Sequence, residues 1–140
     1  MQIHGSCASR AGAGVLLVGP PGSGKSDLVL RLRTLGFDLV ADDRVEIENG
    51  LARPPPALAG LLEVRGLGIF RLPHVGETRL VLVVDLAPLA PRLPVPERHA
   101  TLGLPLVRID AATASAAERI ALALDAALGR VEQIVGALVA

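Results

Sequence analysis

The chain has 140 residues, of which 51% are hydrophobic, so it is long enough for one packed core and too short for two. Lys and Arg together number 14 and balance 14 Asp and Glu, so no basic field points to a nucleic-acid partner. Phe37 and Phe70 are the only Phe, Tyr or Trp residues, which argues against a platform that stacks single-stranded bases.

Neither a membrane segment nor a secretory leader is expected. The longest apolar run, Leu80–Val84, ends at Asp85 and is too short to cross a bilayer. No apolar leader region accompanies His4 and Arg10 near the amino terminus. The lone Cys7 cannot form an internal disulfide and fits a reducing compartment. We therefore expect a single cytoplasmic domain over residues 1–140.

Periodicity and turn signals predict strands that alternate with helices, which is typical of an α/β fold. The predicted elements, in chain order, are a strand over Gln2–Ser9, a strand over Val15–Val18, a helix over Lys25–Leu35 that stops at Gly36, a strand over Phe37–Ala41, a hairpin of Val45–Glu48 and Leu51–Arg53 around Asn49-Gly50, a strand over Leu80–Asp85, an exposed proline-rich stretch over Ala87–Leu104, a strand over Leu106–Ile109, a helix over Ser115–Leu128 and a further short helix over Val131–Val139. Ser115 is expected to be the N-cap of its helix, with Glu118 completing a capping box.

One motif points directly to chemistry. The stretch from Gly19 to Ser26 fits G-x-x-x-x-G-K-[ST], the phosphate-binding P-loop, and it directly follows the apolar run Val15–Val18. Its glycines allow backbone N–H groups to converge on phosphate oxygens, and the following helix adds its positive dipole end. Lys25 is expected at the β and γ phosphates and Ser26 at Mg²⁺. The predicted nucleotide-binding residues are Gly19, Pro20, Pro21, Gly22, Ser23, Gly24, Lys25 and Ser26.

Charged residues elsewhere could complete a reaction site. Asp42 and Asp43 end the strand that follows the P-loop helix, so they should face the phosphates, one at Mg²⁺ and the other as a proton acceptor. Antiparallel pairing could bring His4 near them, although spacing alone favours an exposed histidine. Glu63 and Arg65 share one face of a strand, either as a structural ion pair or with Glu63 at Mg²⁺ and Arg65 at a phosphate.

Together these stretches resemble the catalytic domain of the HPr kinase/phosphorylase family. The resemblance rests on Ile3-His4-Gly5 ahead of Gly12–Leu17, on the P-loop, on Gly36 through Asp43, and on Leu62–Ile69, which is similar to the family signature. It implies a P-loop kinase fold related to phosphoenolpyruvate carboxykinase, with a mixed central sheet and flanking helices. The implied activity is transfer of the γ-phosphoryl group of ATP to a serine of HPr, the phosphocarrier of the bacterial sugar phosphotransferase system. A homo-oligomer, typically a hexamer, is also implied.

The resemblance assigns roles by motif position. Asp42 matches the general base of phosphorylation, His4 the histidine that assists it, and Lys25 the phosphate-binding lysine. Ser26 and Glu63 match the magnesium ligands, and Asp43 is added to them as a neighbouring carboxylate. The family's late catalytic arginine maps onto Arg92.

The chain also departs from the family pattern. Because the sequence begins almost at His4, we expect the usual amino-terminal regulatory domain to be absent, and Pro20-Pro21 replaces a polar pair in the P-loop. The late P-V-x-x-G-R-N stretch, linked to dephosphorylation, has no clear counterpart, because Leu104–Ile109 lacks the Gly-Arg-Asn. The resemblance therefore favours kinase activity over phosphorolysis. A small-molecule P-loop kinase and a non-catalytic ATP-binding regulatory module are the alternatives.

Overall fold

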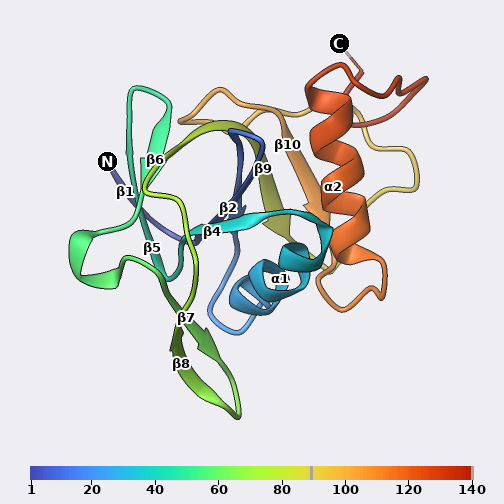
Figure 1. Ribbon diagram of the computed structural model, residues 1–140. Coiled ribbons are helices and arrows are strands. Elements are labelled where there is room, and N and C mark those ends of the chain that lie inside the picture. Colours follow the sequence, from blue (N-terminus) through green and yellow to red (C-terminus); the bar gives the residue numbers. More distant parts are fainter. Residues whose placement is uncertain (89, 140) are drawn as a thin grey trace.

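The computed structural model describes residues 1–88 and 90–139 and has an eight-stranded mixed sheet with two α-helices in those residues (Figure 1). The strands of this sheet are β1 (Gln2–His4), β2 (Ser6–Arg10), β3 (Ala13–Val18), β4 (Asp38–Ala41), β5 (Arg44–Glu48), β6 (Leu51–Arg53), β9 (Thr78–Leu86) and β10 (Leu106–Ile109). The helices are α1 (Lys25–Leu32) and α2 (Ala116–Ala127), with short 3₁₀ turns at Arg33–Leu35 and Pro56–Leu58. A separate hairpin consists of β7 (Leu61–Val64) and β8 (Gly68–Arg71). The predicted α/β class and mixed sheet are confirmed.

The strand order places the P-loop strand β3 inside the sheet. The order is β1-β5-β6-β9-β3-β2-β4, and β10 also pairs with β9. β3 is parallel to β9 and antiparallel to β2, which is in turn antiparallel to β4. β3 and β4 therefore run in the same direction with β2 between them. Their carboxyl ends lie at one edge of the sheet, as the sequence predicts for the P-loop and the Asp42-Asp43 pair.

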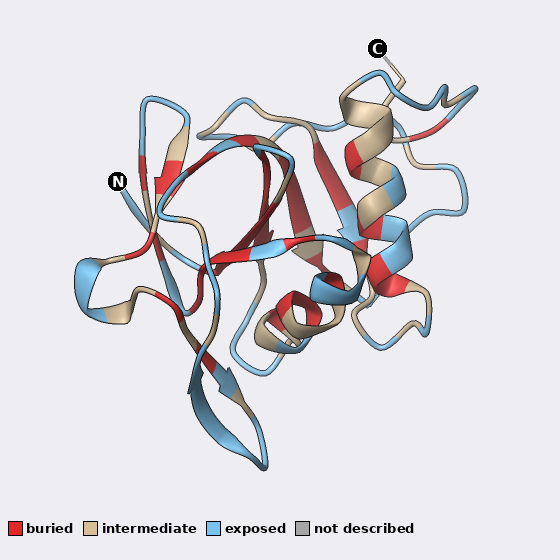
Figure 2. Cartoon of the chain, in the orientation of Figure 1, coloured by how far each residue is buried: buried red, intermediate tan, exposed pale blue. Residues whose placement is uncertain are grey.

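The sheet separates two hydrophobic clusters (Figure 2). Both helices pack on one face, where Leu28 and Ile120 meet Val15 from the P-loop strand. On the other face no helix residue is among the buried members, and Val45 and Ile47 of β5 pack against Leu16 and Val40. Burial of these apolar side chains is the main force that fixes the strands, at roughly 25 cal/mol per Å² of apolar surface removed from water. The helices thus cover one face only.

The prediction of one strand over Gln2–Ser9 is wrong, because the chain breaks at Gly5 into β1 and β2. β1 pairs with β5, while β2 lies between β3 and β4. A Cβ atom at position 5 would lie 2.6 Å from the carbonyl oxygen of Leu17, so only glycine allows this crossing. The break carries His4 away from the P-loop strand and towards Arg44, its register partner on β5.

The P-loop helix and the Asn49-Gly50 hairpin form close to their predicted positions. α1 ends at Leu32, continues as a 3₁₀ turn, and stops at Gly36 with a φ of 86°. Asn49 and Gly50 have φ values of 52° and 77°, the paired positive values that a tight β-hairpin turn requires. The proline-rich stretch over Ala87–Leu104 is largely exposed in its described residues, and position 89 lies outside them.

Ser115 is the N-cap of α2, as predicted. The predicted capping box is wrong, because the Ser115 hydroxyl makes no capping bond and instead accepts a 2.8 Å hydrogen bond from Nε of Arg119. The predicted short helix over Val131–Val139 is wrong as well. Residues 131–139 form turns instead of a helix, and Gly136 has a φ of 135° that no helix contains. A nine-residue segment is too short to hold a helix without tertiary packing.

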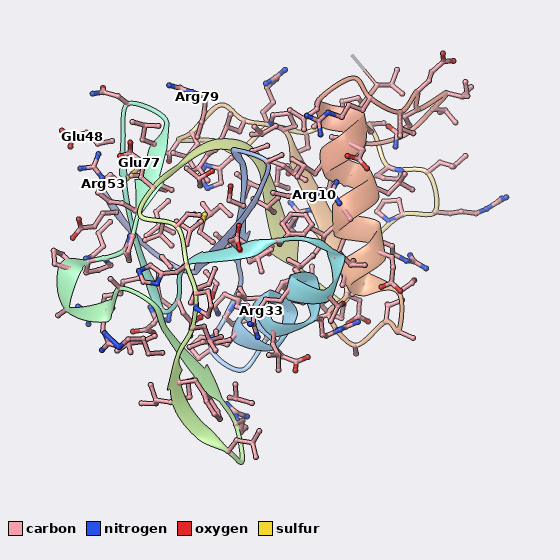
Figure 3. All side chains as sticks on the ribbon, viewed as in Figure 1. Arg10, Arg33, Glu48, Arg53, Glu77 and Arg79 are labelled. Carbon is pink, nitrogen blue, oxygen red and sulfur yellow. The ribbon has the colours of Figure 1, made fainter. Side chains whose placement is uncertain are left out.

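Arg10 fastens α2 to the sheet (Figure 3). Its guanidinium donates a 2.7 Å hydrogen bond to Asp125 of α2 and lies 4.8 Å from the ring centroid of Phe37. The ion pair is half-buried, so it contributes more than a fully exposed pair would. No helix in the described part of the chain has the length and apolar character needed to cross a bilayer.

Candidate active site

The P-loop connects the end of β3 to the start of α1 and has the backbone shape that its motif predicts. Gly22 and Gly24 have φ values of 79° and 98°, in the region that side chains disfavour. Gly24 is the N-cap of α1, so the amides of the first helical turn have no partner within the helix. A loop that turns free N–H groups towards one point is suited to anionic oxygens.

Lys25 begins α1 and folds back over the loop. Its Nζ donates hydrogen bonds to the carbonyl oxygens of Gly19, at 2.8 Å, and Pro20, at 3.0 Å, and lies 3.4 Å from Oγ of Ser23. Burial lowers the pKa of this ammonium, and the charges of Asp42 and Asp43 partly oppose that shift. The lysine is therefore a cation held over the loop by three oxygens.

Asp42 links the P-loop helix to the neighbouring strands. Its Oδ1 accepts a 2.7 Å hydrogen bond from Oγ of Ser26 on α1 and another of 2.7 Å from Oγ of Ser6 on β2. The carboxylate is buried, so two hydroxyl donors on one oxygen fix its orientation. The prediction that the strand-end carboxylates reach the P-loop is confirmed for Asp42.

Ser6 is the residue that sequence reasoning missed. It is fully buried at the start of β2, directly after the Gly5 break, and it supplies half of the hydrogen bonds to Asp42. The available signal was a small polar residue at the start of an otherwise apolar stretch. That signal is weak, because buried serines are common in strands that bond to a neighbouring residue.

Asp43 faces outwards beside His4. The carboxylate is exposed, and its Oδ1 lies 3.7 Å from Nδ1 of His4, while its Oδ2 lies 3.9 Å from Nε of Arg44. Its φ of 70° is one of few positive values outside glycine, and Asp tolerates it better than most residues. The backbone is held there because the amide of Gly5 donates a 3.1 Å hydrogen bond to the Asp43 carbonyl. His4 thus lies beside the aspartate pair, as the alternative based on strand pairing expected. Its contact is with Asp43, and the pairing of β1 with β5 places it there.

Glu63 and Arg65 come from the separate hairpin. Both are exposed, and among the described residues no carboxylate lies within 4.0 Å of the Arg65 guanidinium. Of the two alternatives for these residues, the structural Glu63–Arg65 ion pair is therefore excluded, and the alternative in which both side chains meet a ligand stays a prediction.

One cleft of about 480 Å³ brings most of the predicted site residues together. Its lining consists of His4, Ser6, Pro21, Gly22, Gly24, Lys25, Ser26, Asp27, Leu30, Asp42, Asp43, Glu63, Val64 and Arg65. The remaining predicted P-loop residues are not in that lining: Gly19, Pro20 and Ser23. They contact the ammonium of Lys25 through their oxygen atoms. Arg92 is exposed in the proline-rich stretch and does not line the cleft, so its role stays a prediction.

Comparisons with known proteins point in one direction. Residues 1–86 match the family model of the HPr Serine kinase C-terminal domain. The chain is 38% identical to the HPr kinase/phosphorylase of Aromatoleum aromaticum, over 91% of this chain and 47% of that protein. It is 44% identical to HPr kinase/phosphorylase 1 of Oceanobacillus iheyensis, over 60% of this chain and 31% of that protein. The chain thus spans about half the length, or less, of these curated relatives.

A solved structure shows the same fold. The chain matches the Hpr(Ser) kinase/phosphatase from Coxiella burnetii with a TM-score of 0.76 and 25% identity, covering 92% of this chain and 97% of that one. The likeness therefore includes the second half of the chain, where the family model ends.

Proposed function

The chain belongs to the HPr Serine kinase C-terminal domain family, and from that membership and the cleft we propose that it is an ATP-dependent protein serine kinase that phosphorylates HPr. The observation that carries the proposal is the 2.7 Å bond between Ser26 of the P-loop helix and Asp42 of the neighbouring strand. That bond joins the phosphate-binding motif to a carboxylate inside one cleft, whose lining also includes Glu63 from the signature hairpin.

The residues of the cleft fit ATP and Mg²⁺. The amides of the P-loop and the ammonium of Lys25 suit phosphate oxygens. Oxygen donors of Ser26, Asp42 and Glu63 suit a hard divalent cation, which commonly takes one or two carboxylates together with substrate phosphates. When bound, ATP supplies the γ-phosphoryl group, and Mg²⁺ offsets the negative charge of its phosphate oxygens.

The geometry favours exchanging the predicted roles of the two aspartates. Asp42 is buried and bonded to the Ser26 hydroxyl, so we place it on the magnesium side with Ser26 and Glu63. Asp43 is exposed beside His4, so we place it where an incoming hydroxyl arrives. The family resemblance assigned Asp42 as base, and Asp43 was added to the metal ligands as a neighbouring carboxylate. Both assignments stay predictions, and the two asparagine variants distinguish them.

In the proposed reaction, Asp43 accepts the proton of the HPr serine hydroxyl as the serine oxygen bonds to the γ-phosphorus. His4, at 3.7 Å, orients the carboxylate through Nδ1. The bond from the γ-phosphorus to the oxygen that bridges it to ADP breaks in line with the attack. Lys25 and the P-loop amides hold the charge that gathers on the departing phosphate oxygens. The products are phosphoserine and ADP.

Transfer of label tests the proposal. The protein is incubated with γ-labelled ATP, Mg²⁺ and HPr, or with a panel of small hydroxyl compounds in place of HPr. We expect label on an HPr serine, identified by mass spectrometry, and loss of that label in Lys25→Met. Label on a small hydroxyl compound would instead support a small-molecule kinase.

Binding without transfer would support the third alternative. A regulatory module would bind ATP through Lys25 and Ser26 but would label neither HPr nor the small compounds. In that case Asp42→Asn and Asp43→Asn would leave nucleotide binding unchanged and would have no transfer to lose. A homo-oligomer remains a prediction of the family resemblance and a cytoplasmic location a prediction from the composition, and the proposed chemistry requires neither.

A further inference from the structure

The β7–β8 hairpin extends away from the body of the molecule (Figures 1 and 2). All four residues of β8 are exposed. Large apolar side chains concentrate there, with Leu67 75% exposed in the turn, Ile69 70% exposed and Phe70 42% exposed. Phe70 pairs with the buried Leu62 and shares its face, which leaves Ile69 and the turn residue Leu67 as the strongly exposed apolar side chains, and neighbouring exposed apolar side chains mark a binding site more often than scattered single residues do.

Only one side of the hairpin is anchored. Leu62 is fully buried in the core and Val64 packs against it, which holds the base of β7. On the opposite side of the ribbon, Ile69 pairs in register with Glu63 and remains open. An isolated two-stranded hairpin is only marginally stable in water, so a partner that covers the open side would also stabilise it.

The end of β7 and the start of the following turn border the cleft. Glu63, Val64 and Arg65 line the cleft beside Asp43, so the open side of the ribbon begins where the acceptor hydroxyl must arrive. Arg65 and Arg71 add positive charge along the ribbon. Among the described residues, neither guanidinium has a carboxylate within 4.0 Å. The surface therefore combines the apolar Ile69 and Leu67 with the cations of Arg65 and Arg71 and the carboxylate of Glu63 beside the cleft, and it leads into the site of transfer.

We propose that the β7–β8 hairpin is a docking arm for the acceptor protein. Its matching partner surface has exposed apolar side chains next to the acceptor serine and at least one carboxylate to meet Arg65 or Arg71. This inference rests on the proposed kinase function and adds to it. The cleft performs the transfer, and the hairpin selects the protein that presents the serine.

The other exposed apolar side chains provide a control. Leu122 on α2 is 57% exposed and does not line the cleft. Substitution there changes surface polarity at a distance from the proposed docking arm. If general hydrophobicity were responsible for acceptor binding, Leu122 would matter as much as Leu67 or Ile69.

The test compares the double variant Leu67→Ser/Ile69→Thr with Leu122→Gln, using purified HPr as the probe. Threonine keeps a β-branched side chain in the strand, and both substituted side chains are exposed, so the fold should survive. We expect the KM for HPr, and the dissociation constant of HPr measured by calorimetry, to rise at least about tenfold in the double variant. Both values should stay at the wild-type level in Leu122→Gln, and the dissociation constant of ATP should not change in either variant.

A charge reversal provides a second readout. Arg71→Glu should raise the KM for HPr at low salt and lose most of that effect at high salt, because exposed charges are screened. Loss of ATP affinity in either hairpin variant would overturn the inference, because it would place the hairpin in nucleotide binding instead.

The outcomes separate the docking arm from the proposed function. If the wild type labels HPr and the double variant does so with an unchanged KM, the function stands and the docking arm is overturned. If the wild type labels nothing, the proposed function fails and HPr binding decides the inference: weaker binding by the double variant supports the arm, and equal binding overturns it. A double variant that sediments as a smaller assembly while its KM for HPr is unchanged overturns the arm in favour of a contact between copies of this chain.

Discussion

The two walls of the cleft differ in how they are held. The inner wall carries Ser6, Lys25 and Asp42, which are all buried. Asp42 accepts hydrogen bonds from Ser6 and from Ser26 of α1, and Lys25 donates to the carbonyl oxygen of Gly19 in the P-loop. The outer wall carries His4, Asp43 and the hairpin residue Glu63, all exposed. The inner side chains come from elements that pack in the core, so they have little freedom to move. The outer side chains end in solvent, where a second protein can reach them.

This difference has a functional meaning under the proposed mechanism. Phosphate and magnesium require donors at fixed distances, which rigid elements supply best. A protein acceptor requires an accessible surface, because its serine must reach the γ-phosphorus. Substitutions in the inner wall, and of Glu63 as a proposed magnesium ligand, should therefore damage nucleotide and metal binding, whereas substitutions of His4 and Asp43 should damage transfer or acceptor binding.

Lys25→Met should give the largest effect. The substitution removes the cation that is held over the P-loop, so the rate of transfer to HPr should fall by about 10³-fold. The rate is measured in single turnovers with γ-labelled ATP, and the unfolding transition checks that the variant is folded. A variant that keeps near wild-type transfer would contradict the assignment of Lys25 to the phosphates.

Ser6→Ala should give an intermediate effect. It removes one of the two hydroxyl donors to the buried Asp42, so we expect a loss of about 1 kcal/mol in the free energy of unfolding and a roughly tenfold loss of kcat. Ser9→Ala is the matched control, because Ser9 is buried on the same strand and bonds Thr78 at 2.7 Å, outside the cleft. The control should lose similar stability and keep its kcat. Equal kcat values in the two variants would contradict a role of Ser6 in the site.

Arg44→Gln should give a small effect. Arg44 lies 3.9 Å from Asp43, and both side chains are exposed, so their interaction is worth at most about 1 kcal/mol. We expect kcat for HPr phosphorylation to change by less than about threefold. A loss of a hundredfold or more would mean that the outer wall is held as rigidly as the inner one.

Cys7→Ala should leave transfer unchanged and alter only the pH dependence of stability. Burial raises the pKa of the Cys7 thiol far above its ordinary value, and the strand around it lies next to Ser6. Because the folded-state pKa is raised, the native state loses stability once the thiol of the unfolded chain ionises, above about pH 8.5. Above that pH, Cys7 should lower the free energy of unfolding by about 1.4 kcal/mol per pH unit. This decrease should be missing from Cys7→Ala in denaturant titrations between pH 7 and pH 10.

The inner wall could be predicted from the sequence because its signals are local. The P-loop motif fixes the position of Lys25 and Ser26 within eight residues. The strand after the P-loop helix then places Asp42 at the same edge of the sheet. Only the role of Ser6 was not predicted, because it depends on the break at Gly5. The local sequence gives no sign that a Cβ atom at position 5 would lie 2.6 Å from the carbonyl oxygen of Leu17.

The outer wall was harder to predict because it depends on distant pairings. His4 reaches Asp43 through the β1–β5 register, which joins positions about 40 residues apart. Spacing alone favoured an exposed histidine, which His4 is, while its approach to the aspartate pair was the alternative based on strand pairing, and the family resemblance then favoured a role in the site. The hairpin signature located Glu63 and Arg65, yet the sequence could not decide whether they pair with each other. Arg92 lies in a proline-rich stretch without strong periodicity and is exposed, so neither the sequence pattern nor core packing determines where its side chain lies.

The most direct test of the division between the two walls is the Mg²⁺ dependence of HPr phosphorylation in Asp42→Asn and Asp43→Asn. We expect Asp43→Asn to lower kcat by about 10²- to 10⁴-fold without moving the Mg²⁺ concentration at half-maximal rate. We expect Asp42→Asn to raise that concentration by about 10- to 100-fold and to recover much of its rate at high Mg²⁺. The opposite pattern, with the Mg²⁺ requirement shifted by Asp43→Asn and kcat lost in Asp42→Asn, would contradict the division of roles between the two aspartates.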